Sequence, residues 1–279
     1  MLSVIICTGK YLGLFFILHN GIKAVLLYGV NTLKINEQIL PFSINKIIGE
    51  TIIGVLMNEQ NALVFFPYAG GSASSFEILK KHLSEEVRII SMSYSVSEFS
   101  VSKNSTDFFS VLLENLKNQL KAFEGKLTFF GHSIGAIIAY ELAILGCNHL
   151  NIQRLIVSAC KPPELLVNSK IFNSEDNAFE KITLLGGLPQ MVSSDPIRLK
   201  KVKHKVTRDL RVLIYYARMT YPKVNCEIHA LSARDDFLAS ENEMKIWSNY
   251  TNKGFRKSTF DGNHFYFRDK SKEVAQLIL

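Results

Sequence analysis

Short apolar runs alternate with amphipathic stretches along the chain from residue 62 onwards. Runs rich in β-branched and aromatic residues are typical of strands, and apolar residues that recur every three or four positions are typical of helices. The predicted strands cover residues 62–68, 87–94, 126–130, 154–160, 225–233 and 255–261. The predicted helices cover residues 106–121, 134–146 and roughly 240–250. Strands that alternate with helices indicate a mainly parallel sheet with helices on both faces.

Residues 161–222 interrupt this alternation. Within them, residues 197–216 carry apolar side chains at helical spacing, namely Leu199, Val202, Val206, Leu210 and Leu213. The same stretch has seven basic residues and one acid, Asp209. We interpret the region as a helical insertion whose basic face is either solvated surface or a contact surface for an acidic partner.

The first sixty residues do not follow the same pattern. The apolar run "YLGLFFIL" (11–18) has eight residues, whereas a helix that spans a bilayer needs about 20. We therefore expect no stable membrane span. A packed or poorly ordered extension is the favoured interpretation, and an anchor on a membrane surface is the alternative.

The composition narrows the class of protein. The four cysteines, Cys7, Cys147, Cys160 and Cys226, form no C-x-x-C pair, which is typical of reduced thiols and of a cytoplasmic location. The net charge of +7 suits an acidic partner or simple solubility. Since no basic motif is interleaved with aromatic residues, no nucleic-acid partner is expected.

The turn "GHSIG" (131–135) joins a predicted strand to a predicted helix and carries the clearest chemical pattern. In G-x-S-x-G the serine lies on a sharp turn that exposes its hydroxyl at the end of a sheet. The next backbone N–H lies at the start of a helix, where it can stabilise developing negative charge. Ser133 is therefore the candidate nucleophile, and a glycine-rich turn without chemistry is the alternative.

A serine nucleophile needs a base. His264 is the candidate because it follows the last predicted strand, in "FDGNHFYF", where Gly262 permits a tight loop. His132 adjoins the serine, and His229 lies inside a predicted strand. Both of these are expected to be structural.

The base in turn needs an acid that orients it. In hydrolases that use the G-x-S-x-G turn, the chain order is Ser, then Asp or Glu, then His. The segment "SARDDFL" follows the strand predicted over 225–233 and supplies two candidates in that order. Asp236 is favoured, and Asp235 stays open.

Five spaced motifs resemble those of the type II thioesterases that accompany nonribosomal peptide and polyketide synthases. In chain order they are "FFPYAGGSASSF" (65–76), "GHSIGA" (131–136), "LLGGLP" (184–189), "RDLRVL" (208–213) and "GNHFYF" (262–267). The resemblance runs from about residue 62 to about residue 267. It implies an α/β-hydrolase fold: a mainly parallel central sheet with helices on both faces and a helical lid inserted at about 161–222.

The resemblance also implies roles for single residues. Ser133 matches the nucleophile of the family and His264 its base, and an ungapped count back from His264 places Asp236 at the catalytic aspartate. The backbone N–H groups of Ala69 and Ile134 match the oxyanion hole.

The acid loop departs from the pattern of the family. Ala233 replaces a glycine and Phe237 a proline, so the assignment of the acid to Asp235 stays open. Residues 1–56 resemble nothing in the family, whose members usually begin near the position of Met57. We therefore expect an N-terminal extension of unknown role over 1–56 and a thioesterase domain over 57–279.

The function implied by the resemblance is hydrolysis of acyl thioesters on the phosphopantetheine arms of acyl or peptidyl carrier domains. Such an enzyme clears misprimed or stalled carriers, and its reaction needs no cofactor and no metal. One alternative is a medium-chain acyl-carrier thioesterase or an esterase on the same fold. An alternative of another class is a non-catalytic protein that binds carrier domains.

Overall fold

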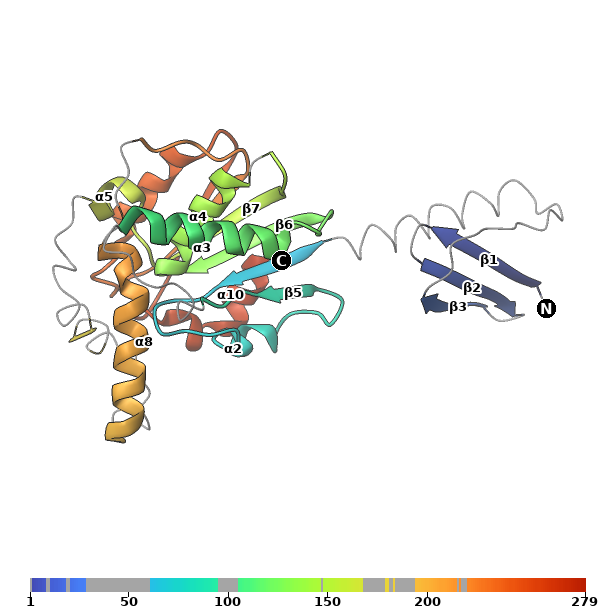
Figure 1. Cartoon of the computed structure of the whole chain (residues 1–279), viewed down its shortest axis with the longest axis horizontal. Helices are drawn as coiled ribbons and strands as arrows, with labels where there is room; N and C mark the ends of the chain where they lie inside the picture. Colours follow the sequence, from blue (N-terminus) through green and yellow to red (C-terminus); the bar gives the residue numbers. More distant parts are fainter. Residues whose placement is uncertain are drawn as a thin grey trace. The chain divides into compact units, whose positions relative to one another are not determined.

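A six-stranded sheet forms the centre of the C-terminal part of the chain in this computed structural model (Figure 1). Its strands are β4 (Ala62–Phe66), β5 (Arg88–Ser91), β6 (Lys126–His132), β7 (Asn151–Ser158), β8 (Glu227–Ala233) and β9 (Phe255–Phe260). Their order across the sheet is β5-β4-β6-β7-β8-β9, and every neighbouring pair runs parallel. The parallel sheet predicted from the alternating pattern is confirmed.

The structure describes residues 2–8, 11–18, 21–28, 61–94, 105–146, 148–167, 179–180, 183, 194–214, 216 and 220–279. The contacts divide the chain into two compact units, Met1–Gly54 and Val55–Leu279. The "LLGGLP" motif and much of the predicted lid lie outside the described residues.

The N-terminal unit contains three antiparallel strands in the order β1-β2-β3. They are β1 (Leu2–Thr8), β2 (Tyr11–Leu18) and β3 (Gly21–Tyr28). The apolar run at 11–18 is thus the central strand of a small sheet. The sequence interpretation did not predict these strands, since a continuous apolar run of eight residues has no strand-specific period.

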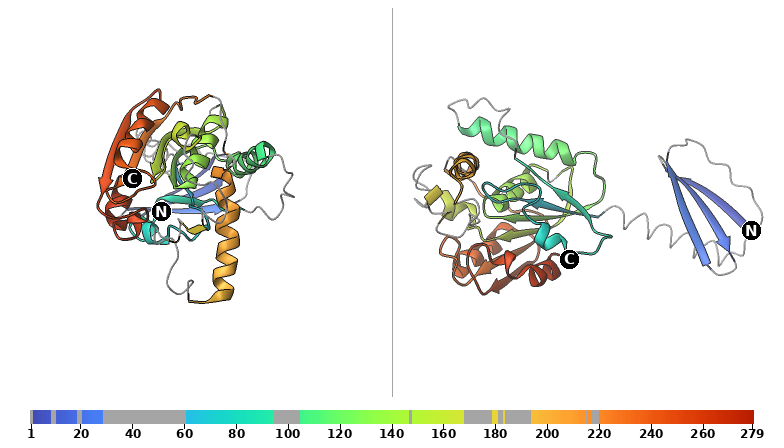
Figure 2. Two further views of the ribbon diagram at one scale, coloured as in Figure 1. Left: turned by 90° about the vertical axis from the view of Figure 1, so that its left-hand side faces the viewer. Right: turned by 90° about the horizontal axis from the view of Figure 1, so that it is seen from below.

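Helices cover both faces of the six-stranded sheet. Those described are α2 (Glu77–Lys80), α3 (Ser105–Leu120), α4 (Ile134–Leu145), α5 (Pro163–Val167), α8 (Pro196–Ile214), α9 (Glu241–Lys245) and α10 (Ser271–Ile278), with 3₁₀ turns η2 (Ile246–Tyr250) and η3 (Tyr266–Arg268). Helix α4 packs on β6 and β7 with α3 beside it, whereas α10 packs with α2 on the opposite face (Figures 1 and 2). No helix in the described ranges has the length and apolar character needed to cross a membrane.

Several element boundaries differ from the predicted ones by one to three residues, and two of the differences have a clear local cause. The strand predicted over 154–160 ends at Ser158, because Ala159 adopts a φ of 51°, outside the range of a strand. The helix predicted over 240–250 is α9 followed by the 3₁₀ turn η2. Ser240 caps α9: its hydroxyl accepts from the N–H of Glu243, whose side chain accepts in turn from the N–H of Ser240.

Buried aromatic rings fix the central strands. All five residues of β4 are buried. The ring of Phe65 stacks on Phe76 with centroids 4.9 Å apart and meets Phe130 edge-on at 5.4 Å.

Because the strands run parallel, their carboxyl ends share one edge of the sheet, and the candidate residues follow β4, β6, β8 and β9 at that edge.

Candidate active site

Ser133 occupies a strained turn between β6 and α4. Its backbone has φ 55° and ψ −126°, a conformation that costs a non-glycine residue about 1–3 kcal/mol. A Cβ at Gly131 would lie 2.3 Å from the carbonyl oxygen of Gly135, and one at Gly135 would lie 2.1 Å from that of Phe66. Both glycines are therefore required by close backbone packing, as the G-x-S-x-G pattern predicts.

The start of α4 offers backbone donors beside the serine. The first N–H groups of a helix have no intrahelical partner and carry partial positive charge. Ser133 is the N-cap residue, its hydroxyl makes no capping hydrogen bond, and the first turn contains no acidic residue. The N–H of Ile134, the first helical residue, stays a predicted oxyanion donor.

Asp236 and His264 form a buried pair. Asp236 Oδ2 lies 2.8 Å from His264 Nδ1, and the two residues are 2% and 1% exposed. The second oxygen of Asp236, Oδ1, accepts from the backbone N–H of Leu238 at 2.9 Å. The neighbouring Asp235 is exposed, and its backbone N–H donates to the carbonyl oxygen of Gly262. The structure brings Asp236, rather than Asp235, to the histidine.

The second ring nitrogen of His264 remains available. Nε2 is buried and has no hydrogen-bond partner among the described residues. With Nδ1 directed to Asp236, Nε2 is the atom that can exchange a proton. Catalytic hydrogen bonds of this kind often tighten only when substrate binds.

His132 has a structural setting, as expected. Its Nδ1 lies 2.8 Å from the Ser158 hydroxyl, which lies 2.6 Å from the Tyr266 hydroxyl. Burial holds the pKa of His132 well below its usual value, with the charges of His264 and Arg268 acting in the same direction. The ring is therefore neutral, and its centroid is 5.1 Å from that of His264. His229 is also packed, with Nε2 2.9 Å from the Ser258 hydroxyl.

The loop after β4 carries Ala69, the other expected oxyanion donor. The loop begins against the serine turn, since a Cβ at Gly135 would also meet the carbonyl oxygen of Pro67 at 2.7 Å. Ala69 is buried, and its N–H makes none of the hydrogen bonds found within the described residues.

The described residues contain no cluster of three or more His, Cys, Asp or Glu that could hold a metal ion.

A model of the thioesterase domain family matches residues 61–279, which include the whole six-stranded sheet and every candidate site residue. The chain belongs to the thioesterase domain family. This thioesterase is a thioester hydrolase on the α/β-hydrolase fold, so the expected class of enzyme is confirmed.

Relatives of this thioesterase agree with that assignment. It is 30% identical over 223 residues to thioesterase PikA5 of Streptomyces venezuelae, a match that covers 78% of this chain and 79% of PikA5. It is 25% identical over 219 residues to thioesterase TesA of Mycobacterium leprae, covering 76% and 83% of the two chains. The structure of RedJ, a thioesterase from the prodiginine biosynthetic pathway of Streptomyces coelicolor, matches with a TM-score of 0.67 at 25% identity over 79% of this chain and 91% of RedJ.

Proposed function

We propose that this enzyme is a type II thioesterase that releases acyl groups from the phosphopantetheine arms of carrier domains. The observation that carries the proposal is the buried Asp236–His264 pair, found with a strained serine turn in a thioesterase domain. Similar proteins that are named thioesterases, one of them from a biosynthetic pathway, support acyl thioesters as the substrate class. We place the enzyme in the cytoplasm with such carriers, and we assign catalysis to residues 57–279, with a lid at about 161–222.

In the proposed reaction, Ser133 Oγ attacks the thioester carbonyl carbon while His264 Nε2 takes the hydroxyl proton. Asp236 holds the imidazole with its Nδ1–H directed to the carboxylate and stabilises the imidazolium. The N–H groups of Ala69 and Ile134 bind the oxyanion, each contributing about 3 kcal/mol to lowering the barrier. The C–S bond then breaks, and the thiolate takes the proton from His264.

Water completes the cycle. His264 Nε2 takes a proton from water, whose oxygen attacks the acyl-serine carbonyl. Collapse of the second tetrahedral intermediate releases the carboxylic acid and returns the proton to Ser133 Oγ. These steps need neither a metal nor a soluble cofactor.

The substrate class can be tested by presenting one acyl group on three supports: a phosphopantetheine-loaded carrier domain, coenzyme A and a simple alcohol ester. We expect kcat/KM to be highest for the carrier. A preference for the ester would favour the esterase alternative. Carrier binding without hydrolysis, and without labelling of Ser133 by a fluorophosphonate, would favour a non-catalytic carrier-binding protein.

The basic face of α8 supplies a second test. Lys200, Lys201 and Lys203 are exposed, and the first turns of α8 project from the sheet (Figure 1). Carrier domains generally present acidic surfaces, and charges at the rim of an interface mainly raise the association rate. We propose that this face meets the carrier.

Changing these three lysines to glutamate should raise the apparent KM for acyl-carrier substrates and leave turnover of a small free thioester unchanged. Added salt should reproduce part of the effect in the unchanged enzyme, because exposed charges are screened over about 10 Å at 0.1 M salt. A matched control is glutamate at Lys121, Lys126 and Lys253, exposed lysines that precede or begin β6 and β9. Equal losses in the two triple variants would show that net charge, and not this face, matters.

A further inference from the structure

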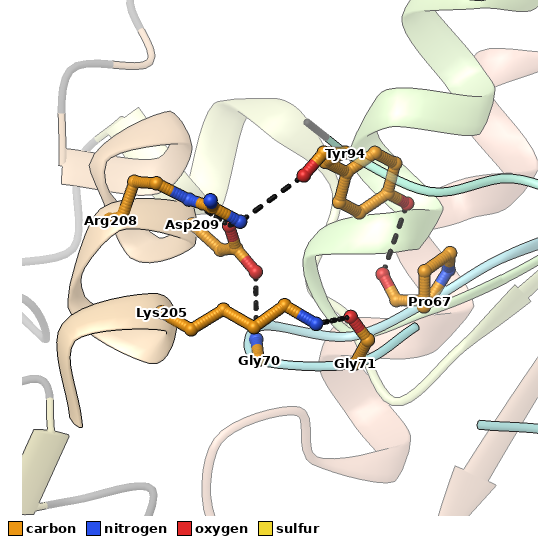
Figure 3. Close-up of polar contacts among 7 residues, drawn as sticks. All are labelled: Pro67, Gly70, Gly71, Tyr94, Lys205, Arg208 and Asp209. Atoms are coloured by element: carbon orange, nitrogen blue, oxygen red, sulfur yellow. Dashed lines mark hydrogen bonds and ion pairs between the residues drawn. The ribbon is translucent and has the colours of Figure 1, made fainter. Parts of the chain in front are cut away.

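The loop that carries Ala69 is held by side chains of α8, a helix about 140 residues later in the chain (Figure 3). The backbone N–H of Gly70 donates to Asp209 Oδ2 at 2.8 Å, across a sequence separation of 139. On the next residue of the loop, the carbonyl oxygen of Gly71 accepts from Lys205 Nζ at 2.5 Å. Two successive residues after Ala69 are thus bonded to one helix.

Apolar packing strengthens the same contact. A Cβ at Gly70 would lie 2.5 Å from Val206 Cγ2, so the helix rests directly on the backbone of the loop. Val206 and Leu210 are 2% and 0% exposed, whereas Ile197 in the first turn of α8 is 71% exposed. The buried part of α8 is therefore its second half, which also carries the residues that contact the loop.

Arg208 links this contact, through Tyr94, to Pro67 on the N-terminal side of Ala69. It donates from Nε and Nη2 to Asp209 Oδ1, at 3.0 and 2.8 Å, and from Nη2 to the carbonyl oxygen of Tyr94 at 3.1 Å. The Tyr94 hydroxyl in turn donates to the carbonyl oxygen of Pro67 at 3.0 Å. Figure 3 shows that Pro67, Gly70 and Gly71 are all held by this network. The fixed residues lie on both sides of Ala69.

The network contains the buried carboxylate of Asp209, and burial disfavours the charged form of that group. Burial raises the pKa of Asp209, against the opposing effects of Arg208, the Gly70 N–H and Lys205. A buried ion pair of this kind is weak evidence for stability, because desolvation offsets much of the attraction. A role in setting geometry explains the arrangement better, since an oxyanion donor acts well only when it is fixed before the reaction.

We infer that Asp209 and Arg208 are positioning residues that hold the N–H of Ala69 where the oxyanion of the tetrahedral intermediate forms. This inference rests on the proposed function, in which Ala69 is an oxyanion donor. Neither side chain touches the reacting atoms: each acts through the backbone of residues 67–71.

The main test replaces Asp209 with leucine, which has a similar shape and no acceptor for the Gly70 N–H. With a small free thioester as substrate, kcat should fall about 10- to 100-fold, as expected for a catalytic group displaced by about 1 Å, while KM stays within twofold. Asp209→Asn retains one acceptor oxygen and should recover much of the rate. Arg208→Met keeps an apolar stem but loses the bonds to Asp209 and Tyr94, and should lower kcat in the same direction.

The matched control is Lys121→Ala, an exposed position just after α3 that should leave turnover of the free thioester unchanged. Rates are expressed per active site, counted by labelling Ser133 to completion with a fluorophosphonate. A trifluoromethyl ketone with the same acyl chain forms a hemiketal oxyanion, so its inhibition constant should rise by the same factor as kcat/KM falls.

Two outcomes would overturn the inference. One is turnover per labelled site within twofold of the unchanged enzyme in both Asp209→Leu and Arg208→Met. The other is a slower rate with an unchanged inhibition constant for the ketone, which would place the loss outside the oxyanion hole. Failure of the proposed function looks different: the unchanged enzyme itself would then neither hydrolyse the thioester nor be labelled at Ser133.

Discussion

Ser133→Ala is expected to lower kcat for thioester hydrolysis by a factor on the order of 10⁴ to 10⁶. The proposed acyl-enzyme cannot form without the Ser133 hydroxyl. The fold should be almost unaffected, because the change removes one oxygen that caps nothing and leaves the backbone of the turn in place. Steady-state hydrolysis of a loaded carrier domain measures the effect.

Carrier binding and the melting midpoint serve as controls for this variant. Both should stay close to those of the unchanged enzyme, since the proposed carrier surface lies on α8 rather than at the serine turn. Turnover near that of the unchanged enzyme would remove Ser133 from the mechanism. A large fall in the melting midpoint would instead mean that the activity loss reflects unfolding.

Asp236→Asn should lower kcat by about 10⁴, because an asparagine amide can direct its N–H to His264 Nδ1 and stabilise the wrong tautomer of the ring. Asp235→Asn is the matched control: the same chemical change, one residue away, on an exposed side chain that does not contact the histidine. It should change kcat by less than twofold. A larger loss in Asp235→Asn than in Asp236→Asn would move the acid one residue upstream.

The sheet and the serine turn could be predicted from the sequence because their determinants are local. Buried parallel strands produce short apolar runs, and the close approach at Gly131 and Gly135 admits only glycine. The position of His264 follows from the order of the strands. The apolar runs and the glycine-flanked serine are read from neighbouring residues, whereas the position of His264 needs only the order of the strands along the chain.

The choice between the two aspartates could not be made locally. Both follow the same strand, and what distinguishes them is the contact of Asp236 with His264, 28 residues later in the chain, whereas Asp235 is exposed. In the sequence, Asp209 is the single acid of a basic stretch and part of the "RDLRVL" motif. Its position between Val206 and Leu210 on the buried face of α8 could have indicated a buried partner, but its contact with Gly70 depends on the tertiary fold.

The chain contains a single tryptophan, Trp247, in the turn η2. Its indole is fully buried, donates to the carbonyl oxygen of Cys160 at 2.7 Å, and packs edge-on against Tyr140 and obliquely against Tyr250. All native indole fluorescence therefore comes from one buried site beside the segment that follows β7. Its emission should shift to the red in a single step when the sheet unfolds, which gives every variant described above an internal optical reporter of the fold without any label.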